Sequence, residues 1–272
     1  MDSNYLALYT HYLKVPYTDK QRRVRVLLPS NYETEANDYP VVYMHDGQNI
    51  FFSRESYSGY SWKLIPLLKY AKKLPPMIIV GIDNSEESRF DEYMPWQVEI
   101  QNDEQSIFAG GMGEKYAQWL VEMVKPFVDK HYRTKQDRKH TILAGSSLGA
   151  VITAFTGAAY PEVFGNLGVF SLASWIDEQS FTQYIAKYPI DSKTKVYIQS
   201  GTNEGNEIDQ LLTTKDTDQA YIDSSINYYN TLLKNSHDLN CVQLRIFAGE
   251  SHFEKYWADH FGEFLNFVFD KN

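Results

Sequence analysis

The segment Gly145-Ser146-Ser147-Leu148-Gly149 places two glycines symmetrically around one serine. This spacing fits the G-x-S-x-G nucleophile elbow, in which the serine sits on a strained turn between a strand and a helix. Glycines at these positions leave room for the adjacent backbone. An apolar strand-like run precedes Ser147 and a helix-like run follows it, so we predict that Ser147 is a nucleophile. Ser146 lacks the glycine bracket, and the alternative is a structural turn with a capping serine.

A serine hydroxyl is a weak nucleophile and needs a general base. In chains with this elbow the order is serine, acid, histidine. Of the seven histidines, those that follow Ser147 are His237, His252 and His260. His252 comes just after the strand-like run 242–249, where a loop at the carboxyl end of a strand can reach the serine. We predict His252 as the base, and packing or solvent-exposed roles for the other two.

The acid should follow the preceding strand-like run, residues 195–201. The candidates are Glu204, Glu207 and Asp209. Glu204 comes first and is our prediction, Glu207 is the main alternative, and a solvated acidic loop is the remaining interpretation. The acid would hold the tautomer of His252 and stabilise its imidazolium form without taking a proton.

An oxyanion needs backbone N–H donors. We expect one from Leu148, the residue after the serine. We expect the second from Gly47 or Gln48, in the turn "YMHDGQNIFF" that follows an early strand-like run. His45 is predicted to brace this turn, and Asp46 to cap it or hydrogen-bond to it.

These residues need a scaffold, and the chain alternates between two kinds of segment. Strand-like runs cover 22–29, 39–47, 75–84, 140–145, 165–172, 195–201 and 242–249, and helix-like runs cover 61–74, 114–132, 148–164, 220–236 and 253–269. The alternation predicts an α/β fold with a mostly parallel sheet and helices on both faces, in a single domain over residues 1–272. The polar-apolar alternation of 22–29 is typical of a half-buried edge strand. Residues 85–113 break the pattern and are predicted to form a long functional loop.

Composition excludes several functions. The net charge of −9 argues against binding to nucleic acid or to an anionic membrane surface. The N-terminus does not resemble a secretory signal and no run is long enough to span a bilayer, which favours a cytoplasmic protein. No cofactor is expected, because there is no dinucleotide-binding fingerprint or P-loop. No metal is expected either, because His45, Asp46 and Asp83 do not form a known ligand motif.

Four segments together resemble the putative esterase family of α/β-hydrolases. They are "YPVVYMHDGQNIFF", "GIDNSEESRFDEYMPW", "GSSLGAVITAFTGAAYPEVFGNLGVFSLASW" and "SGTNEG…AGESHFEKYW". The family includes esterase D, feruloyl esterases and the enterochelin or bacillibactin esterases. The resemblance implies an α/β-hydrolase fold without a large separate cap, and a triad at Ser147, Glu204 and His252. Family members often have Asp at the acid position, so Glu204 is a departure.

The resemblance extends to residues that surround the reaction. Arg89, Tyr93 and Trp96 are similar to the family's R-x-x-E-Y-x-P-W run, and they either wall the substrate pocket or hold the loop in place. Trp62 and Trp175 are predicted to lie near the rim of the pocket, with core packing as the alternative.

The predicted activity is that of a cofactor-free carboxylic ester hydrolase acting on short-chain or aryl esters. The alternative is a siderophore trilactone esterase, which needs cations facing catecholates; the acidic composition around Arg89 counts against it. Acyl transfer to a sugar and a non-catalytic binding role are further alternatives. The expected partner is a small-molecule ester, and the many tyrosines are compatible with a homo-oligomer.

Overall fold

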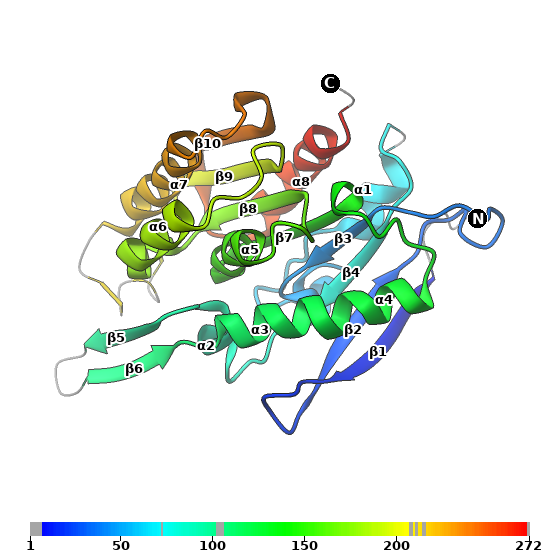
Figure 1. The fold of residues 1–272 in the computed structure, drawn as a ribbon, viewed down its shortest axis with the longest axis horizontal. Helices are drawn as coiled ribbons and strands as arrows, with labels where there is room; N and C mark the ends of the chain where they lie inside the picture. The colour runs from blue at the N-terminus through cyan, green and yellow to red at the C-terminus, as the bar shows by residue number, and fades with distance from the viewer. Residues whose placement is uncertain are drawn as a thin grey trace.

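The computed structural model describes residues 7–71, 73–101, 106–206, 209, 212–213 and 216–270. Figure 1 shows a twisted central sheet with helices on both faces. In this part of the chain the sheet has eight strands in the order β1-β2-β4-β3-β7-β8-β9-β10. Their bounds are β1 Leu8–Lys14, β2 Gln21–Leu27, β3 Val41–Met44, β4 Ile78–Ile82, β7 Thr141–Ser147, β8 Asn166–Leu172, β9 Lys195–Asn203 and β10 Val242–Ser251.

Strand direction confirms the predicted fold class. The pairs β1-β2 and β2-β4 are antiparallel, and every later pair in the order from β4 to β10 is parallel. The helices that cover the sheet are α1 Leu64–Tyr70, α2 Arg89–Tyr93, α3 Gly113–Trp119, α4 Lys125–His131, α5 Leu148–Ala159, α6 Glu178–Lys187, α7 Thr217–Lys234 and α8 Glu254–Phe269. The carboxyl ends of the parallel strands therefore meet at one edge, as ligand sites in such sheets require.

The sheet buries both of its faces, which explains the continuous apolar runs of its central strands. In β3, Val41 and Tyr43 join one core and Val42 and Met44 join the other, because successive side chains of a strand point to opposite faces. The first core is packed by α3 to α7, and the second by α1 and α8. A fully buried Val or Phe side chain stabilises the fold by about 1.5–3 kcal/mol, so these two cores hold the site in place.

One prediction at the edge of the sheet is wrong. The run 22–29 forms β2, which is an interior strand, because β1 pairs with it and takes the edge position. The polar residues of β2 suggested an exposed face, but Arg22 and Arg25 are 6% and 3% exposed. Their guanidinium groups are paired with carboxylates, so they can be buried.

The segment 85–113 is also not the predicted loop. It contains α2 and a two-stranded ribbon formed by β5 (Gln97–Gln101) and β6 (Ser106–Gly110). Figure 1 shows the ribbon projecting away from the central sheet. A buried ion pair at 2.9 Å between Arg22 of β2 and Glu92 of α2 ties this segment to the sheet. In the described ranges, no helix combines the length and apolar character needed to cross a bilayer.

Candidate active site

Ser147 occupies a strained turn at the carboxyl end of β7. It is the last residue of the strand and precedes the first residue of α5, with φ 60° and ψ −127°. A Cβ atom at Gly145 would lie 2.6 Å from the carbonyl oxygen of Gly149, a backbone atom that cannot move aside. A Cβ atom at Gly149 would lie 3.2 Å from Oδ2 of Asp46. Gly145 is therefore needed for close approach, and Gly149 sits in a tight space, as the elbow pattern predicts.

The predicted base and acid contact each other. Nδ1 of His252, in the turn between β10 and α8, lies 2.8 Å from Oε2 of Glu204, which directly follows β9. Glu204 is 1% exposed. Burial alone would raise the pKa of Glu204, but hydrogen bonds from His252, Ser171 and the amide of Gly201 lower it below its ordinary value. The arrangement suits a carboxylate that orients an imidazole.

Sequence reasoning missed the residues that fix this carboxylate. The hydroxyl of Ser171 donates to Oε1 of Glu204 at 2.6 Å, and the amide of Gly201 donates to the same atom at 2.6 Å. The indole N–H of Trp257 in turn donates to Oγ of Ser171 at 2.8 Å. Ser171 has φ 47°, so the end of β8 is bent where it reaches Glu204. A serine between apolar strand residues gave no signal for this role, since the contact depends on tertiary packing.

Tyr221 of α7 packs against the predicted base. Its ring centroid lies 4.8 Å from that of His252. Tyr221 is 1% exposed. A buried phenol ring therefore packs beside the imidazole of His252 and helps to fix its position. The helical periodicity of 220–236 marked this position only as a core residue.

The turn after β3 carries the amides proposed for the oxyanion. Gly47 and Gln48 are the first two residues of the short 3₁₀ turn Gly47–Asn49, and Leu148 is the first residue of α5. N–H groups at such positions have no intrahelical acceptor and are free to bind an anion. Arg25 donates a hydrogen bond of 2.6 Å to the carbonyl oxygen of Gly47 and so fixes the turn. A Cβ atom at Gly47 would meet the backbone of Gly81 at 2.6 Å.

Asp46 supports the same turn in a way that differs from prediction. Its side chain does not cap the 3₁₀ turn. Its carboxylate instead takes a bidentate ion pair from Arg89, at 2.8 and 2.9 Å, and a hydrogen bond from Asn84. Burial would raise the pKa of Asp46, but the charge of Arg89 holds it below its ordinary value. The backbone of Asp46 has φ 53°, so the ion pair stabilises a strained residue beside Gly47.

The residues of segment 85–113 that the resemblance singles out pack into the protein. The hydroxyl of Tyr93 accepts the amide of Asp46 at 3.2 Å, and Tyr93 is fully buried. Trp96 packs edge-on against Phe155 and Tyr184. Together with the Arg89 ion pair, these contacts favour the interpretation that the segment holds the turn in place.

Of the other residues singled out from the sequence, Trp62 lies in the core, Trp175 adjoins the site and His45 is buried. Trp62 is 3% exposed and packs against Phe170 and Phe261, so it belongs to the core. Trp175 lies edge-on to Tyr221, with ring centroids 5.7 Å apart, and therefore adjoins the site. Nδ1 of His45 forms a hydrogen bond of 2.9 Å with the hydroxyl of Tyr116, and burial lowers the pKa of His45 to about 3. A neutral, buried imidazole there suits the predicted bracing role.

The alternative acids fare differently. Glu207 lies outside the described residues. Asp209 is 7% exposed, and its Oδ1 accepts the hydroxyl of Tyr221 at 3.5 Å. Burial raises the pKa of Asp209, an effect that His252 partly offsets. Asp209 thus contacts Tyr221, whereas Glu204 makes the hydrogen bond to the imidazole of His252.

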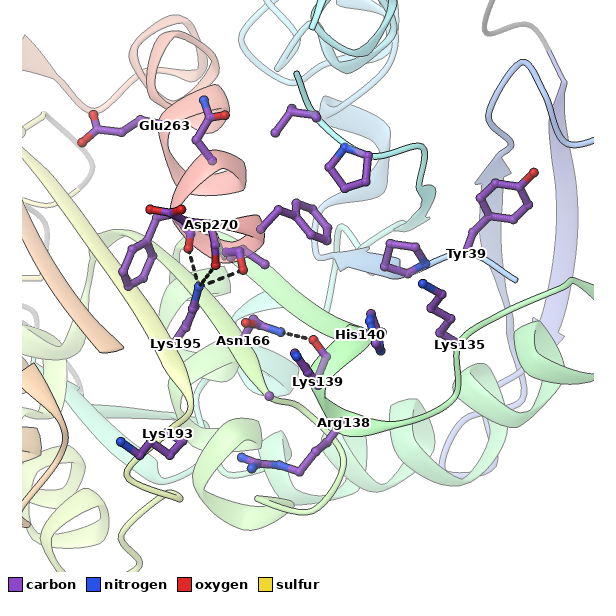
Figure 2. Close-up of a pocket in the computed structure, with 18 of the residues that line it drawn as sticks. Tyr39, Lys135, Arg138, Lys139, His140, Asn166, Lys193, Lys195, Glu263 and Asp270 are labelled. Atoms are coloured by element: carbon purple, nitrogen blue, oxygen red, sulfur yellow. Dashed lines mark hydrogen bonds between the residues drawn. The ribbon is translucent and has the colours of Figure 1, made fainter. Parts of the chain in front are cut away.

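A cavity of about 1870 Å³ lies at the opposite edge of the sheet, where Asn166 and Lys195 begin β8 and β9. Figure 2 shows its cluster of basic side chains. Several are bound within the protein: Lys195 donates to carbonyl oxygens at the end of α8, and Arg245 pairs with Glu263. This cavity lies at the opposite edge of the sheet from Ser147, and part of its basic lining is paired within the protein. Within the described residues, no cluster of three or more His, Cys, Asp or Glu could hold a metal ion.

Comparison with known proteins identifies the family. Residues 16–266 match the family described as "Putative esterase". The chain belongs to this family. Membership confirms the predicted resemblance and the predicted enzyme class, a carboxylic ester hydrolase. The chain is 28% identical over 257 residues to the uncharacterized protein YbbA of Bacillus subtilis, covering 92% of this chain and 94% of that one.

Further relatives carry more specific names. The chain is 24% identical over 178 residues to an endo-1,4-beta-xylanase/feruloyl esterase of Xylanibacter ruminicola, covering 63% of this chain and 22% of that one. An IroE-like serine hydrolase from Shewanella oneidensis superposes with a TM-score of 0.73 at 18% identity, over 96% and 79% of the two chains. The enterobactin esterase FES from Shigella flexneri superposes with a TM-score of 0.68 at 16% identity, covering 97% of this chain and 58% of that one. These likenesses confirm the α/β-hydrolase fold.

Proposed function

We propose that this esterase hydrolyses short-chain or aryl carboxylic esters with a Ser147-His252-Glu204 triad. The observation that carries the proposal is the 2.8 Å contact between His252 and the buried Glu204, at the sheet edge where Ser147 occupies its strained turn. The ring of Tyr221 packs beside the imidazole of His252, with centroids 4.8 Å apart, and supports the proposed position of the base. A carboxylate behind an imidazole beside a serine is the arrangement that activates a hydroxyl for acyl transfer.

The chemistry proceeds in two halves. Oγ of Ser147 attacks the ester carbonyl while Nε2 of His252 takes its proton, and Glu204 stabilises the imidazolium through Nδ1. The amides of Leu148 and of Gly47 or Gln48 bind the oxyanion. His252 then protonates the leaving alcohol. In the second half His252 activates a water molecule, which releases the acid and restores Ser147.

Two features bear on the substrate. The feruloyl esterase relative supports an aryl ester, and Trp175 beside Tyr221 supplies an aromatic surface for it. The siderophore trilactone alternative draws on the likeness to an enterobactin esterase. Catecholates would need free cations near Ser147, whereas Arg89 is engaged in its bidentate pair with Asp46. We therefore favour a small or aryl ester.

The test compares the wild type with Ser147→Ala, and uses Ser146→Ala as the matched control at the adjacent serine. The substrates are p-nitrophenyl acetate, butyrate and octanoate, methyl ferulate, and a catecholate trilactone. We expect Ser147→Ala to lower kcat by at least about 1000-fold on every hydrolysed ester, and Ser146→Ala to retain activity. Activity of Ser147→Ala equal to wild type would refute the triad. Fastest turnover of the trilactone would replace the favoured substrate class with the alternative.

A further inference from the structure

Arg25 of β2 is a buried cation that the triad does not account for. Its side chain is 3% exposed, and its guanidinium lies 5.1 Å from the ring centroid of Phe51. A buried ion pair is often no more stabilising than apolar side chains of similar volume, so core packing alone does not explain a guanidinium at this place in the sheet. Its contacts lead instead to the turn that carries the proposed oxyanion amides.

One hydrogen bond of Arg25 reaches the backbone of that turn. Its Nη2 donates to the carbonyl oxygen of Gly47 at 2.6 Å, and the same oxygen accepts the N–H of Ile50 at 3.4 Å. Hydrogen bonds from a charged donor are stronger than those from a neutral one. A hydrogen bond accepted by the carbonyl of a peptide also polarises the N–H of that peptide, so successive hydrogen bonds strengthen one another. In this peptide the N–H belongs to Gln48, which becomes a stronger donor.

The order of the strands gives the direction of this peptide. From β2 the sheet continues through β4 and β3 to β7. Arg25 pairs with Gly81 of β4, and Gly47 packs on the same glycine, so the carbonyl of Gly47 faces back toward β2. The peptide is trans, and the carbonyl and N–H of a trans peptide point in opposite directions. The N–H of Gln48 therefore points toward β7, which ends at Ser147.

The carboxylates around Arg25 neutralise its charge only in part. Oε2 of Glu55 lies 2.9 Å from Nη1 of Arg25, and Oδ1 of Asp83 lies 3.7 Å from Nη2. Arg23 shares both carboxylates, at 3.2 Å from Glu55 and 2.7 Å from Asp83. Because Asp83 lies closer to Arg23, positive charge remains on the side of Arg25 that faces Gly47. Such a charge acts strongly in a buried site of low dielectric.

We propose that Arg25 is a positioning residue for the oxyanion: it orients and polarises the Gly47–Gln48 peptide, and the N–H of Gln48 is the second oxyanion donor. The inference rests on the proposed function. Negative charge develops on the ester oxygen only as Ser147 attacks, so weakening this donor lowers kcat and leaves KM nearly unchanged.

The first test is Arg25→Gln, with Arg23→Gln as the matched control, because Arg23 pairs with the same two carboxylates. We expect Arg25→Gln to lower kcat on p-nitrophenyl acetate about tenfold or more, with KM within about twofold, and Arg23→Gln to keep kcat within about twofold. The matching thionoester places sulfur, a poorer hydrogen-bond acceptor, where the oxyanion forms. The ratio of ester to thionoester rates should therefore fall in Arg25→Gln and keep its wild-type value in Arg23→Gln.

Glu55→Gln tests the sign of the effect and leaves Arg25 in place. The side chain of Glu55 is 26% exposed, so this variant should fold even if Arg25→Gln does not. Removing the carboxylate leaves more of the charge of Arg25 acting on the peptide, so kcat should be unchanged or up to about threefold higher. If Arg25 only braces the turn, breaking its ion pair loosens the turn and kcat falls. A lower kcat in folded Glu55→Gln would overturn the electrostatic role.

The proposed function and this inference fail in different ways. Equal rates for wild type and Ser147→Ala would refute the triad. A wild-type kcat and a wild-type ester-to-thionoester ratio in Arg25→Gln, in an enzyme that Ser147→Ala inactivates, would overturn the role of Arg25 alone, even if the melting temperature fell. An equal fall of the ratio in Arg25→Gln and Arg23→Gln would also overturn it, because the effect would then belong to the charge cluster and not to the hydrogen bond with Gly47.

Discussion

Glu204 and His252 are 48 residues apart in the chain, yet their side chains meet at 2.8 Å in a site where the carboxylate is almost fully buried. A buried carboxylate needs strong partners, and this one has three hydrogen-bond donors. The relationship makes Glu204 the residue that orients and stabilises the base His252 in the proposed mechanism.

Glu204→Gln should lower kcat by about 1000-fold or more, because an amide cannot stabilise the imidazolium and can favour the wrong tautomer of His252. The measurement is steady-state kinetics on p-nitrophenyl acetate. Glu250→Gln is the control, because Glu250 forms a similar pair with His260, with 2.9 Å between Oε1 and Nε2. This pair lies away from the serine. A normal rate for Glu204→Gln together with a large loss in Glu207→Gln would assign the acid to Glu207.

Ser171→Ala should raise the pKa of the Glu204 carboxyl, measured by NMR titration of that side chain. The hydroxyl of Ser171 is one of the donors that lower the pKa of Glu204, so removing it raises that pKa and the carboxylate is protonated sooner as pH falls. Trp257 also loses its acceptor, which should reduce stability by about 1–3 kcal/mol. Ser174→Ala removes a comparable bond to Glu178 and should leave the titration of Glu204 unchanged; a raised pKa of Glu204 in both variants would argue against the assignment.

The same carboxylate should contribute to acid stability. The folded-state pKa of Glu204 is lower than its ordinary value of 4.5, so its contribution is present above about pH 4.5 and is lost as pH falls through the lower folded value. Melting temperatures measured from pH 7 to pH 3 should therefore fall more steeply for wild type than for Glu204→Gln. Parallel curves would show that Glu204 is not linked to folding.

Gly145→Ala should destabilise the protein severely, because the new Cβ would lie 2.6 Å from a backbone oxygen of Gly149. Gly262→Ala is the control, since its nearest neighbour would be at 3.6 Å and alanine favours a helix over glycine by up to about 1 kcal/mol. Urea unfolding measures the stability of both variants. An unchanged midpoint for Gly145→Ala would mean that the elbow can relax.

Arg89→Met tests whether Arg89 supports the turn or binds substrate. It leaves the buried carboxylate of Asp46 unpaired beside Gly47, so we expect lower stability and a kcat reduced about tenfold or more on all esters. Arg54→Met is the control, because the side chain of Arg54 is 82% exposed. A rise in KM for one class of ester with normal stability would instead assign Arg89 to the pocket.

The parts of the site that the sequence predicts are those with local signatures. Ser147 stands in a fixed pattern, and Glu204 and His252 follow strand-like runs whose carboxyl ends converge in a parallel sheet. Tyr221 contacts His252 and Ser171 contacts Glu204 between elements distant in sequence, so no spacing marks them. The arginines of β2 misled the edge prediction for the same reason: their burial depends on carboxylates from other segments, such as Glu92.

The contribution of α8 to the site has a consequence for how the protein acquires its activity during synthesis. Ser147 leaves the ribosome early, but His252 lies beyond β10, and Trp257, which anchors Ser171 and through it Glu204, belongs to the closing helix α8. On the proposed triad, a nascent chain would carry Ser147 without its base until β10 and α8 have been made and packed against the sheet.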